Sequence, residues 1–330
     1  MQKYRSVFLL VGALVCCSWG FMVHRTVAQL AIYRLPKSLR IFFYVHKEEL
    51  VRYSVRPDQR RNTDSLEAPR HYIDLEPFGD SSAWKMPMDR ATAMQKIAKD
   101  TLFKYGYVPY HIQFIKDKLT EAMRAERADS ILFYAADLSH YISDAHVPLH
   151  TTINYDGQLS GQKGLHALWE TVVPENDFNR FVLKEEGRAH YIDDIPLAAW
   201  TAIREAYQLL PEVLRAEQEV TRQFTDSTKY RIQYRNGKTL KFYTADFAKA
   251  YHQMLGETVN RQLIRSASLI ADFFYTCWVD AGRPDLSQLS APEYTGAVKQ
   301  QQRAERKAYR RDELREKNLL IAVKNNPGAD

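Results

Sequence analysis

Histidines and acidic residues recur in pairs along the first half of the chain, and together they form a donor set that suits zinc. His140 and Asp144 are four residues apart, so they share one face if their segment is helical, and His166 and Glu170 repeat that spacing. His150 follows the first pair closely. Imidazole and carboxylate are ligands that zinc accepts. Each pair alone is more often a hydrogen-bonded polar pair than a metal site, so the prediction rests on their accumulation.

Further candidates lie upstream of these pairs. The segment RPDQRR contains Asp58, and HYID contains His71 and Asp74. His71 precedes two apolar residues, so the alternative is a histidine that packs in the core. Four histidines and at least three carboxylates thus lie in apolar or turn-flanked segments, and this set predicts a zinc centre.

Residues 1–18 have the layout of a secretory signal peptide. A basic start precedes an apolar run too short to span a bilayer, and Cys16 and Ser18 are the small residues expected before a cut at Trp19. A retained membrane anchor or a lipoprotein is a weaker alternative. We therefore expect a secreted or periplasmic protein with no transmembrane segment in the mature chain. The new α-amino nitrogen and the carbonyl oxygen of Trp19 could then chelate a metal that His24 also reaches.

Charge and cysteine content exclude several other classes of site. The net charge is +6, of which the leader carries two and residues 299–330 carry four, from nine Lys/Arg against five Asp/Glu. The remaining body is neutral, so the basic pI does not indicate a nucleic-acid groove. Removal of the leader leaves only Cys277, which excludes an intramolecular disulfide and a zinc site made of cysteines.

The spacing of apolar residues predicts an all-α fold, a single multi-helix domain over 19–282. We expect two helices over 24–52, separated at Pro36, two over 90–123, one over 126–146, a short one over 159–172, and long ones over 196–223 and 244–280. The segment 231–243 predicts a small β-hairpin insertion with Asn236-Gly237 as its turn. Residues 283–330 are a charged tail, expected to be a solvated helix or partly disordered.

The chain resembles one known superfamily in the order of its motifs. The superfamily contains the zinc-dependent phospholipases C and the single-strand-specific zinc nucleases with 3′-nucleotidase activity. The motifs that carry the resemblance are, in order, WGFMVH, PDQRR, HYID, HYISDAHVPLH and GLHALWE. The resemblance implies an α-helical fold with three zinc ions. It places the first ion on Asp58, His71, His140 and Asp144, the second on His150, His166 and Glu170, and the third on Trp19 (amino nitrogen and carbonyl), His24 and the bridging Asp144. It gives no ligand role to His46, His111, His146, His190 and His252.

The implied reaction is hydrolysis of a phosphate ester. A water shared between two zinc ions becomes a hydroxide near neutral pH and attacks phosphorus in line. Asp58 would orient this hydroxide, Asp144 would bridge two of the ions, and Arg61 resembles an arginine that stabilises the transition state. A surface arginine in a basic loop is the other interpretation of Arg61.

The resemblance leaves the substrate open between nucleic acid and lipid. The spacing of Trp19 and His24 is that of the nucleases, in which Tyr72 would stack on a base and Asp74 would read its edge. Asp74 could instead orient a zinc-bound histidine. Glu170 points instead to the phospholipases, which have Glu at this position where the nucleases usually have Asp.

We expect a secreted zinc nuclease or 3′-nucleotidase acting on single-stranded nucleic acid or nucleotides, with no stable protein partner. There are two alternatives. One is a phospholipase C that cleaves phospholipid headgroups, and the other is a non-catalytic zinc-stabilised binding protein.

Overall fold

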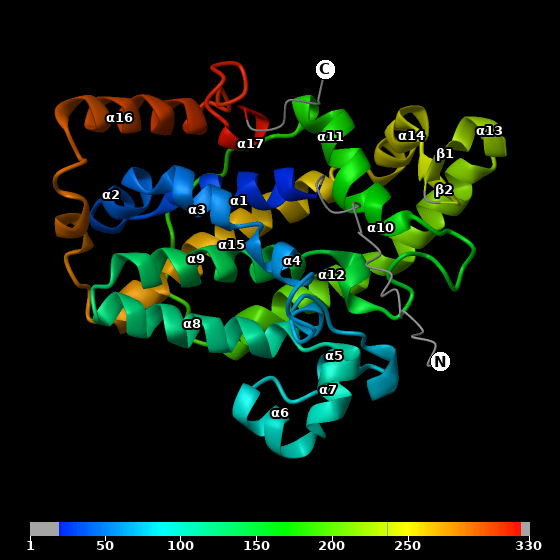
Figure 1. Cartoon of the computed structure of the whole chain (residues 1–330), viewed down its shortest axis with the longest axis horizontal. Coiled ribbons are helices and arrows are strands. Elements are labelled where there is room, and N and C mark those ends of the chain that lie inside the picture. The colour runs from blue at the N-terminus through cyan, green and yellow to red at the C-terminus, as the bar shows by residue number, and fades with distance from the viewer. Residues whose placement is uncertain (1–19, 236, 325–330) are drawn as a thin grey trace, which may run out of the picture.

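Five helices pack side by side and carry most of the buried apolar residues. The structure is a computed structural model that describes residues 20–235 and 237–324. In it α8 packs along α9, α15 contacts both, and α1 lies against α9 and α15, with α12 beside α8 (Figure 1). These helices are α1 (Phe21–Arg34), α8 (Val108–Arg124), α9 (Ala128–Asp144), α12 (Ile195–Thr221) and α15 (Thr258–Asp280).

Shorter helices surround this core. They are α2 (Lys37–Val45), α3 (Lys47–Tyr53), α4 (Arg56–Arg60), α5 (Ser82–Lys85), α6 (Arg90–Lys96), α7 (Lys99–Tyr105), α10 (Leu165–Ala167), α11 (Val173–Asp177), α13 (Asp226–Lys229), α14 (Ala245–Leu255), α16 (Gly296–Arg310) and α17 (Ile321–Lys324). Short 3₁₀ turns are η1 (Ala68–Arg70), η2 (Glu76–Phe78), η3 (Pro148–Thr151), η5 (Phe178–Arg180) and η6 (Leu286–Ser290), and η4 (Leu168–Val172) is a π-helical turn.

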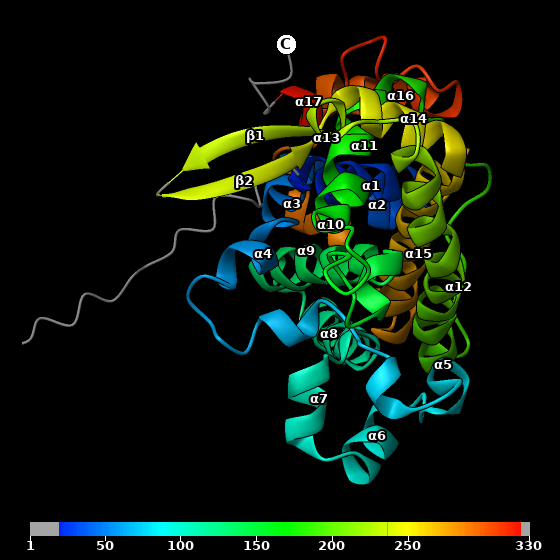
Figure 2. The same ribbon diagram turned by 90° about the vertical axis from the view of Figure 1, so that its right-hand side faces the viewer.

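The predicted all-α class and the small hairpin are both confirmed. Strands β1 (Tyr230–Arg235) and β2 (Lys238–Tyr243) pair antiparallel and project from the helical body (Figure 2). The predicted long helix over 244–280 is divided, because Gly256 adopts a positive φ of 56° between α14 and α15. None of the helices in the described ranges is long and apolar enough to cross a membrane.

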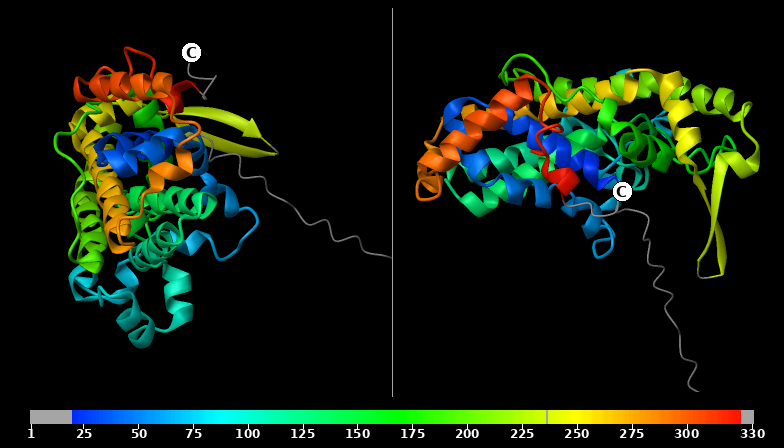
Figure 3. Two further views of the ribbon diagram at one scale, coloured as in Figure 1. Left: turned by 90° about the vertical axis from the view of Figure 1, so that its left-hand side faces the viewer. Right: turned by 90° about the horizontal axis from the view of Figure 1, so that it is seen from above.

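The charged C-terminal segment lies against the helical body. The sequence led us to expect a solvated helix or partial disorder from residue 283. Residues 296–310 do form a helix, α16, and Thr295 caps its N-terminus by accepting a hydrogen bond from the Val298 amide. One face of α16 is buried, however, and its Glu305 accepts bonds from Tyr33 on α1 (2.9 Å) and Lys47 on α3 (2.6 Å). Figure 3 shows α16 and α17 lying over α1 to α3.

Candidate metal centre

The C-terminal end of α9 presents His140 and Asp144 one turn apart on the same face. His140 Nδ1 lies 2.8 Å from the Ser54 carbonyl oxygen, so this nitrogen donates and leaves the lone pair of Nε2 free. That Nε2 atom lies 3.3 Å from Asp144 Oδ2, and both side chains are buried. Helix α9 ends directly afterwards, as expected from Pro148. The i, i+4 spacing of His140 and Asp144 therefore corresponds to two buried donors on one face of α9.

Two residues from the segment after α3 complete a four-residue group around this pair. His71 Nδ1 lies 3.0 Å from Asp144 Oδ2 and 3.1 Å from His140 Nε2. Asp58, on α4, places Oδ1 at 3.7 Å from His71 Nδ1 and 3.8 Å from His140 Nε2. In a tetrahedral zinc site with bonds of about 2.1 Å, neighbouring donors lie about 3.4 Å apart. His71, His140 and Asp144 converge at distances that suit a zinc site, and Asp58 lies within 3.8 Å of the two histidines; Asp58 also converges with His24 and His140. Asp58, His71, His140 and Asp144 are called the four-residue group below.

His150, His166 and Glu170 form a separate three-residue group. Glu170 Oε1 lies 3.2 Å from His150 Nε2, and its Oε2 lies 3.1 Å from His166 Nε2. The two histidine Nε2 atoms are 2.9 Å apart. His166 lies on α10 and Glu170 on the π-helical turn η4 that follows it, and π turns are frequent at functional sites. These three donors also converge as zinc ligands would.

The two carboxylate oxygens of Asp144 face different donors. Oδ2 faces the histidines of its own group, whereas Oδ1 lies 3.7 Å from His24 Nε2. Oδ1 is also 3.7 Å from His150 Nδ1, but this ring nitrogen is opposite to the Nε2 that faces His166 and Glu170. His24, on the first turn of α1, also stacks on the His140 ring with centroids 3.9 Å apart. A carboxylate in this position can hold one metal ion with each oxygen.

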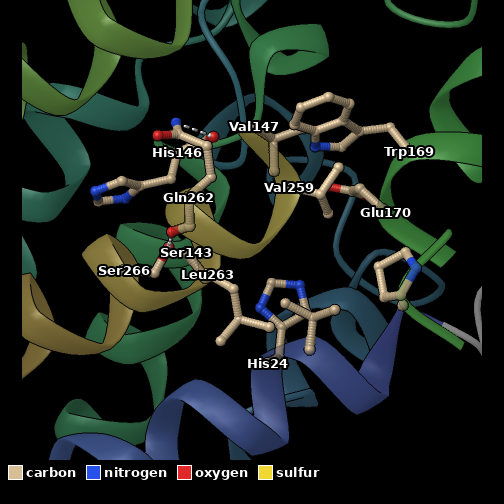
Figure 4. Close-up of a pocket in the computed structure, with 13 residues that line it drawn as sticks. His24, Ser143, His146, Val147, Trp169, Glu170, Val259, Gln262, Leu263 and Ser266 are labelled. Carbon is tan, nitrogen blue, oxygen red and sulfur yellow. Dashed lines mark hydrogen bonds between the residues drawn. The ribbon is translucent and has the colours of Figure 1, made fainter. Parts of the chain in front are cut away.

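A small cavity adjoins His24 and the start of the described chain. It has a volume of about 40 Å³, enough for a water molecule, and His24, Glu170 and Gly20 are among its lining residues (Figure 4). Gly20 also lies close to Thr171, the neighbour of Glu170. Trp19, the proposed chain-end ligand, and the proposed leader 1–18 lie outside the described residues.

A buried carboxylate that the sequence analysis missed orients His71 from behind. Glu67 Oε1 lies 3.4 Å from His71 Nε2, the ring nitrogen opposite to the one that faces the four-residue group. Glu67 is fully buried and accepts hydrogen bonds from Tyr141, Arg60 and Arg70. Burial raises its pKa, but these bonds and the contact with His71 outweigh burial and leave the pKa well below its usual value. Glu67 is therefore a buried anion behind His71, and its 3.4 Å approach to Nε2 is an ion-pair contact that falls short of a hydrogen bond in the structure.

The buried donors of the four-residue group differ in protonation before metal binds. Burial lowers the pKa of His71, but the hydrogen bond to Asp144 and the ion-pair contact with Glu67 outweigh it and raise that pKa to about 9. Burial and the neighbouring His24 instead hold the pKa of His140 well below its usual value. Metal binding at this group must therefore displace a proton from His71, whereas His140 is already neutral.

Three further candidate residues lie at the edge of the four-residue group. Arg61 is partly exposed, with Nη1 3.6 Å from Asp58 Oδ1. Burial and the charge of Asp74 raise the pKa of Tyr72, and the charge of Arg61 opposes them, so the three side chains share one region. Burial and the nearby Glu76 raise the pKa of Asp74 to about 7. This region can offer a cation, an aromatic ring and an acid that is half protonated near neutrality.

The five other histidines lie outside both groups, and several have structural partners of their own. His146 Nδ1 lies 2.8 Å from the Ile142 carbonyl oxygen, and His252 Nδ1 lies 2.8 Å from Asp177. His190 is largely exposed on a loop. None of these five histidines belongs to either group, although His146 lines the small cavity beside His24 (Figure 4).

Comparison with protein families gives a match over most of the chain. The sequence profile described as S1/P1 Nuclease matches residues 19–278, which is most of the chain and contains every residue of both groups. A search of curated proteins found none that matches.

Proposed function

We propose a nuclease function from one premise: this chain belongs to the S1/P1 nuclease family, whose members are zinc-dependent phosphodiesterases. The observation that supports the proposal best is Asp144, whose Oδ2 faces His71 and His140 while its Oδ1 faces His24. A hydrolase that spreads charge over neighbouring metal ions needs a bridging carboxylate of this kind.

We assign three zinc ions to this centre. The four-residue group would hold the first ion and the three-residue group the second. His24, Asp144 Oδ1 and the amino nitrogen and carbonyl oxygen of Trp19 would hold the third. The position of Gly20 supports this, because Gly20 lies close to Thr171 and lines the same small cavity as His24 and Glu170. The third assignment requires cleavage before Trp19, so it also implies export of the mature protein.

The chain's own residues would bind and orient a phosphodiester next to these ions. When bound, zinc supplies the acidity that ionises a water at neutral pH and the positive charge that stabilises negative charge on phosphate. Asp58 would orient the attacking water, and two observations support this role: its carboxylate reaches the four-residue group and is partly open to solvent. Arg61, held beside Asp58, would contact a non-bridging phosphate oxygen.

Tyr72 and Asp74 would recognise the base. Tyr72 is half-buried and can stack on a nucleobase, and such stacking contributes about 1–3 kcal/mol per base. Asp74, with a pKa of about 7, can donate as well as accept a hydrogen bond at the edge of the base. This pairing requires an unpaired base, which is why we propose single-stranded nucleic acid or a 3′-nucleotide as substrate.

One observation favours a phospholipase C as the second candidate. The loop that precedes His166 exposes Ile153, Tyr155 and Leu159, and the Tyr155 ring lies 6.3 Å from the His166 ring. Exposed apolar side chains beside the centre would also suit a lipid surface.

Parallel assays separate these functions. The mature protein starting at Trp19, loaded with zinc, should cleave single-stranded RNA, single-stranded DNA or a 3′-mononucleotide. The Asp74→Asn variant should show a changed preference among the bases, whereas its rate of cleavage of an abasic substrate should change less. Cleavage of phosphatidylcholine alone would establish the phospholipase, and bound zinc without any turnover would establish a binding protein. One extra residue before Trp19 should remove one zinc equivalent; full zinc content would refute the chain-end ligand.

A further inference from the structure

A second pocket lies far from the metal centre, between α2 and α16. Its volume is about 410 Å³, which is within the range of small-molecule sites. Helix α2, the turn at Tyr294 and helix α16 enclose it. Figure 1 shows these elements at one end of the molecule, whereas α10 and the three-residue group lie toward the other end. The pocket therefore is not an extension of the proposed active site.

The lining of this pocket is almost entirely cationic. It contains seven lysine and arginine side chains, one tyrosine, one glutamine and no acidic residue. Among the described residues, none of the seven cations forms an ion pair. The buried acid of the same helix, Glu305, points away from the pocket to Lys47 and Tyr33. The fold therefore gathers these cations without supplying counter-charges.

The cations destabilise one another's charged forms. Burial and then the charge of Arg306 lower the pKa of Arg40 to about 10, and Arg310 contributes in the same direction. Burial and the charge of Arg310 likewise lower the pKa of Arg306. Mutual repulsion of this kind is unfavourable for the folded protein unless an anion offsets it.

Buried hydrogen-bond donors in the pocket also lack partners in the described chain. Arg40 is only 7% exposed, and its Nη1 donates to the Leu35 carbonyl, but its Nε has no partner. Gln302 is 5% exposed; its Oε1 accepts a bond from Tyr294, which leaves the amide Nε2 without an acceptor. Arg306 Nε is in the same situation. Unpaired buried donors are rare, so their presence in one pocket indicates an acceptor-rich ligand.

We propose that this pocket binds a compact molecule carrying two or more phosphate groups, such as a nucleoside diphosphate. Phosphate offers only acceptors and multiple negative charge, and the planar guanidinium groups of arginines match it through paired hydrogen bonds. The ligand would connect α2 to α16 and so fasten the C-terminal helix to the domain. The proposal is independent of the substrate of the metal centre.

Two features favour a compact ligand over a polynucleotide or a membrane. Tyr294 is the only aromatic side chain in the lining, whereas binding of a single strand uses a series of stacking rings. No large apolar side chain is exposed on α2 or α16, so a lipid surface would find no apolar anchor there. Arg303, Lys307 and Arg310 are exposed, so a small ligand in the pocket can contact them directly, whereas the Nε atoms of Arg40 and Arg306 are buried.

The test is calorimetric titration of the zinc-loaded full-length mature protein with adenosine 5′-(α,β-methylene)diphosphate. Arg303→Gln/Lys307→Gln removes two exposed cations of the pocket, and Arg40→Gln removes the buried donor. Each should weaken binding by about tenfold or more, since charge-assisted hydrogen bonds are lost. Phosphodiesterase activity and zinc content should stay unchanged. Arg311→Gln/Lys317→Gln removes two exposed cations outside the pocket and serves as the matched control.

Each other outcome would overturn the proposal. Absence of diphosphate binding, or binding that the two pocket variants do not weaken, would show that the pocket is not the site. Equal weakening in the control would show a diffuse charge effect. If the pocket variants impair binding of a long single-stranded oligonucleotide or of anionic vesicles but not of the diphosphate, the pocket serves a strand or a membrane instead.

Discussion

Replacing Glu67 by glutamine tests whether a buried carboxylate controls the metal centre from behind its ligands. The carboxylate lies 3.4 Å from His71 Nε2, an ion-pair contact that favours the ring orientation with Nδ1 toward the four-residue group. Glu67→Gln keeps the shape and an acceptor oxygen but removes the charge. Loss of such an orienting partner typically weakens metal binding about 10- to 100-fold, which corresponds to about 1.4–2.7 kcal/mol.

The fold should survive this change because the two neighbouring arginines keep other partners. Arg60 also pairs with Asp137 at 2.8 Å, and Arg70 with Asp64 at 3.3 Å. Zinc affinity is measured by competition with a chromophoric chelator at constant pH, and thermal unfolding of the metal-free protein reports any loss of stability separately.

Tyr141→Phe is the control for this experiment. It removes the hydroxyl that donates to the same carboxylate but leaves the contact of Glu67 with His71 intact. If Glu67→Gln binds zinc as tightly as the unmodified protein, or if Tyr141→Phe weakens zinc binding to the same extent, then Glu67 has only a structural role in its ion-pair network and the reasoning is wrong.

Three further predictions follow from the same site. Asp144→Asn should lower zinc content, measured by elemental analysis, by more than one equivalent, because Oδ2 faces His71 and His140 while Oδ1 faces His24; loss of a single equivalent would contradict bridging. Gly106→Ala should destabilise the protein by about 1–3 kcal/mol and raise KM for single-stranded substrate with zinc content kept, since φ is 81° and the new Cβ would lie 2.3 Å from the Tyr72 carbonyl oxygen. In the metal-free protein the pKa of His71 is raised to about 9 from 6.5, so its stabilising contribution is complete below pH 6.5 and is lost as pH rises through 9. The melting temperature of the metal-free protein should therefore fall over that interval, less so in His71→Gln, and zinc affinity should rise over it; a pH-independent affinity would show that His71 releases no proton.

Local features of the fold were predictable because their causes are local. The Asn236-Gly237 turn between alternating residues predicted the hairpin that β1 and β2 form. The i, i+4 spacing of His140 and Asp144 likewise predicted two donors on one face of a helix. The break at Gly256 was missed, since apolar spacing continues on both sides of it and only the positive φ separates the helices.

Long-range features were less accessible from sequence. That Asp58 and His71 approach α9 depends on packing between distant segments, and only the family resemblance suggested it. Glu67 lies in a loop rich in charges, where nothing in its spacing distinguishes a buried carboxylate from a solvated one. The buried face of α16 was also hidden, because two of its buried residues, Gln302 and Glu305, are polar and interrupt the apolar pattern.

The anchoring of α1 by the last part of the chain has a consequence for biosynthesis. Gln29 exchanges hydrogen bonds with the Leu319 carbonyl (2.8 Å) and the Ile321 amide (2.9 Å), and Tyr33 donates to Glu305. The helix that carries His24 therefore acquires these contacts only after residues 305–321 have been synthesised. We expect a chain ending at residue 295 to bind less zinc than the 330-residue chain; equal zinc content would refute this.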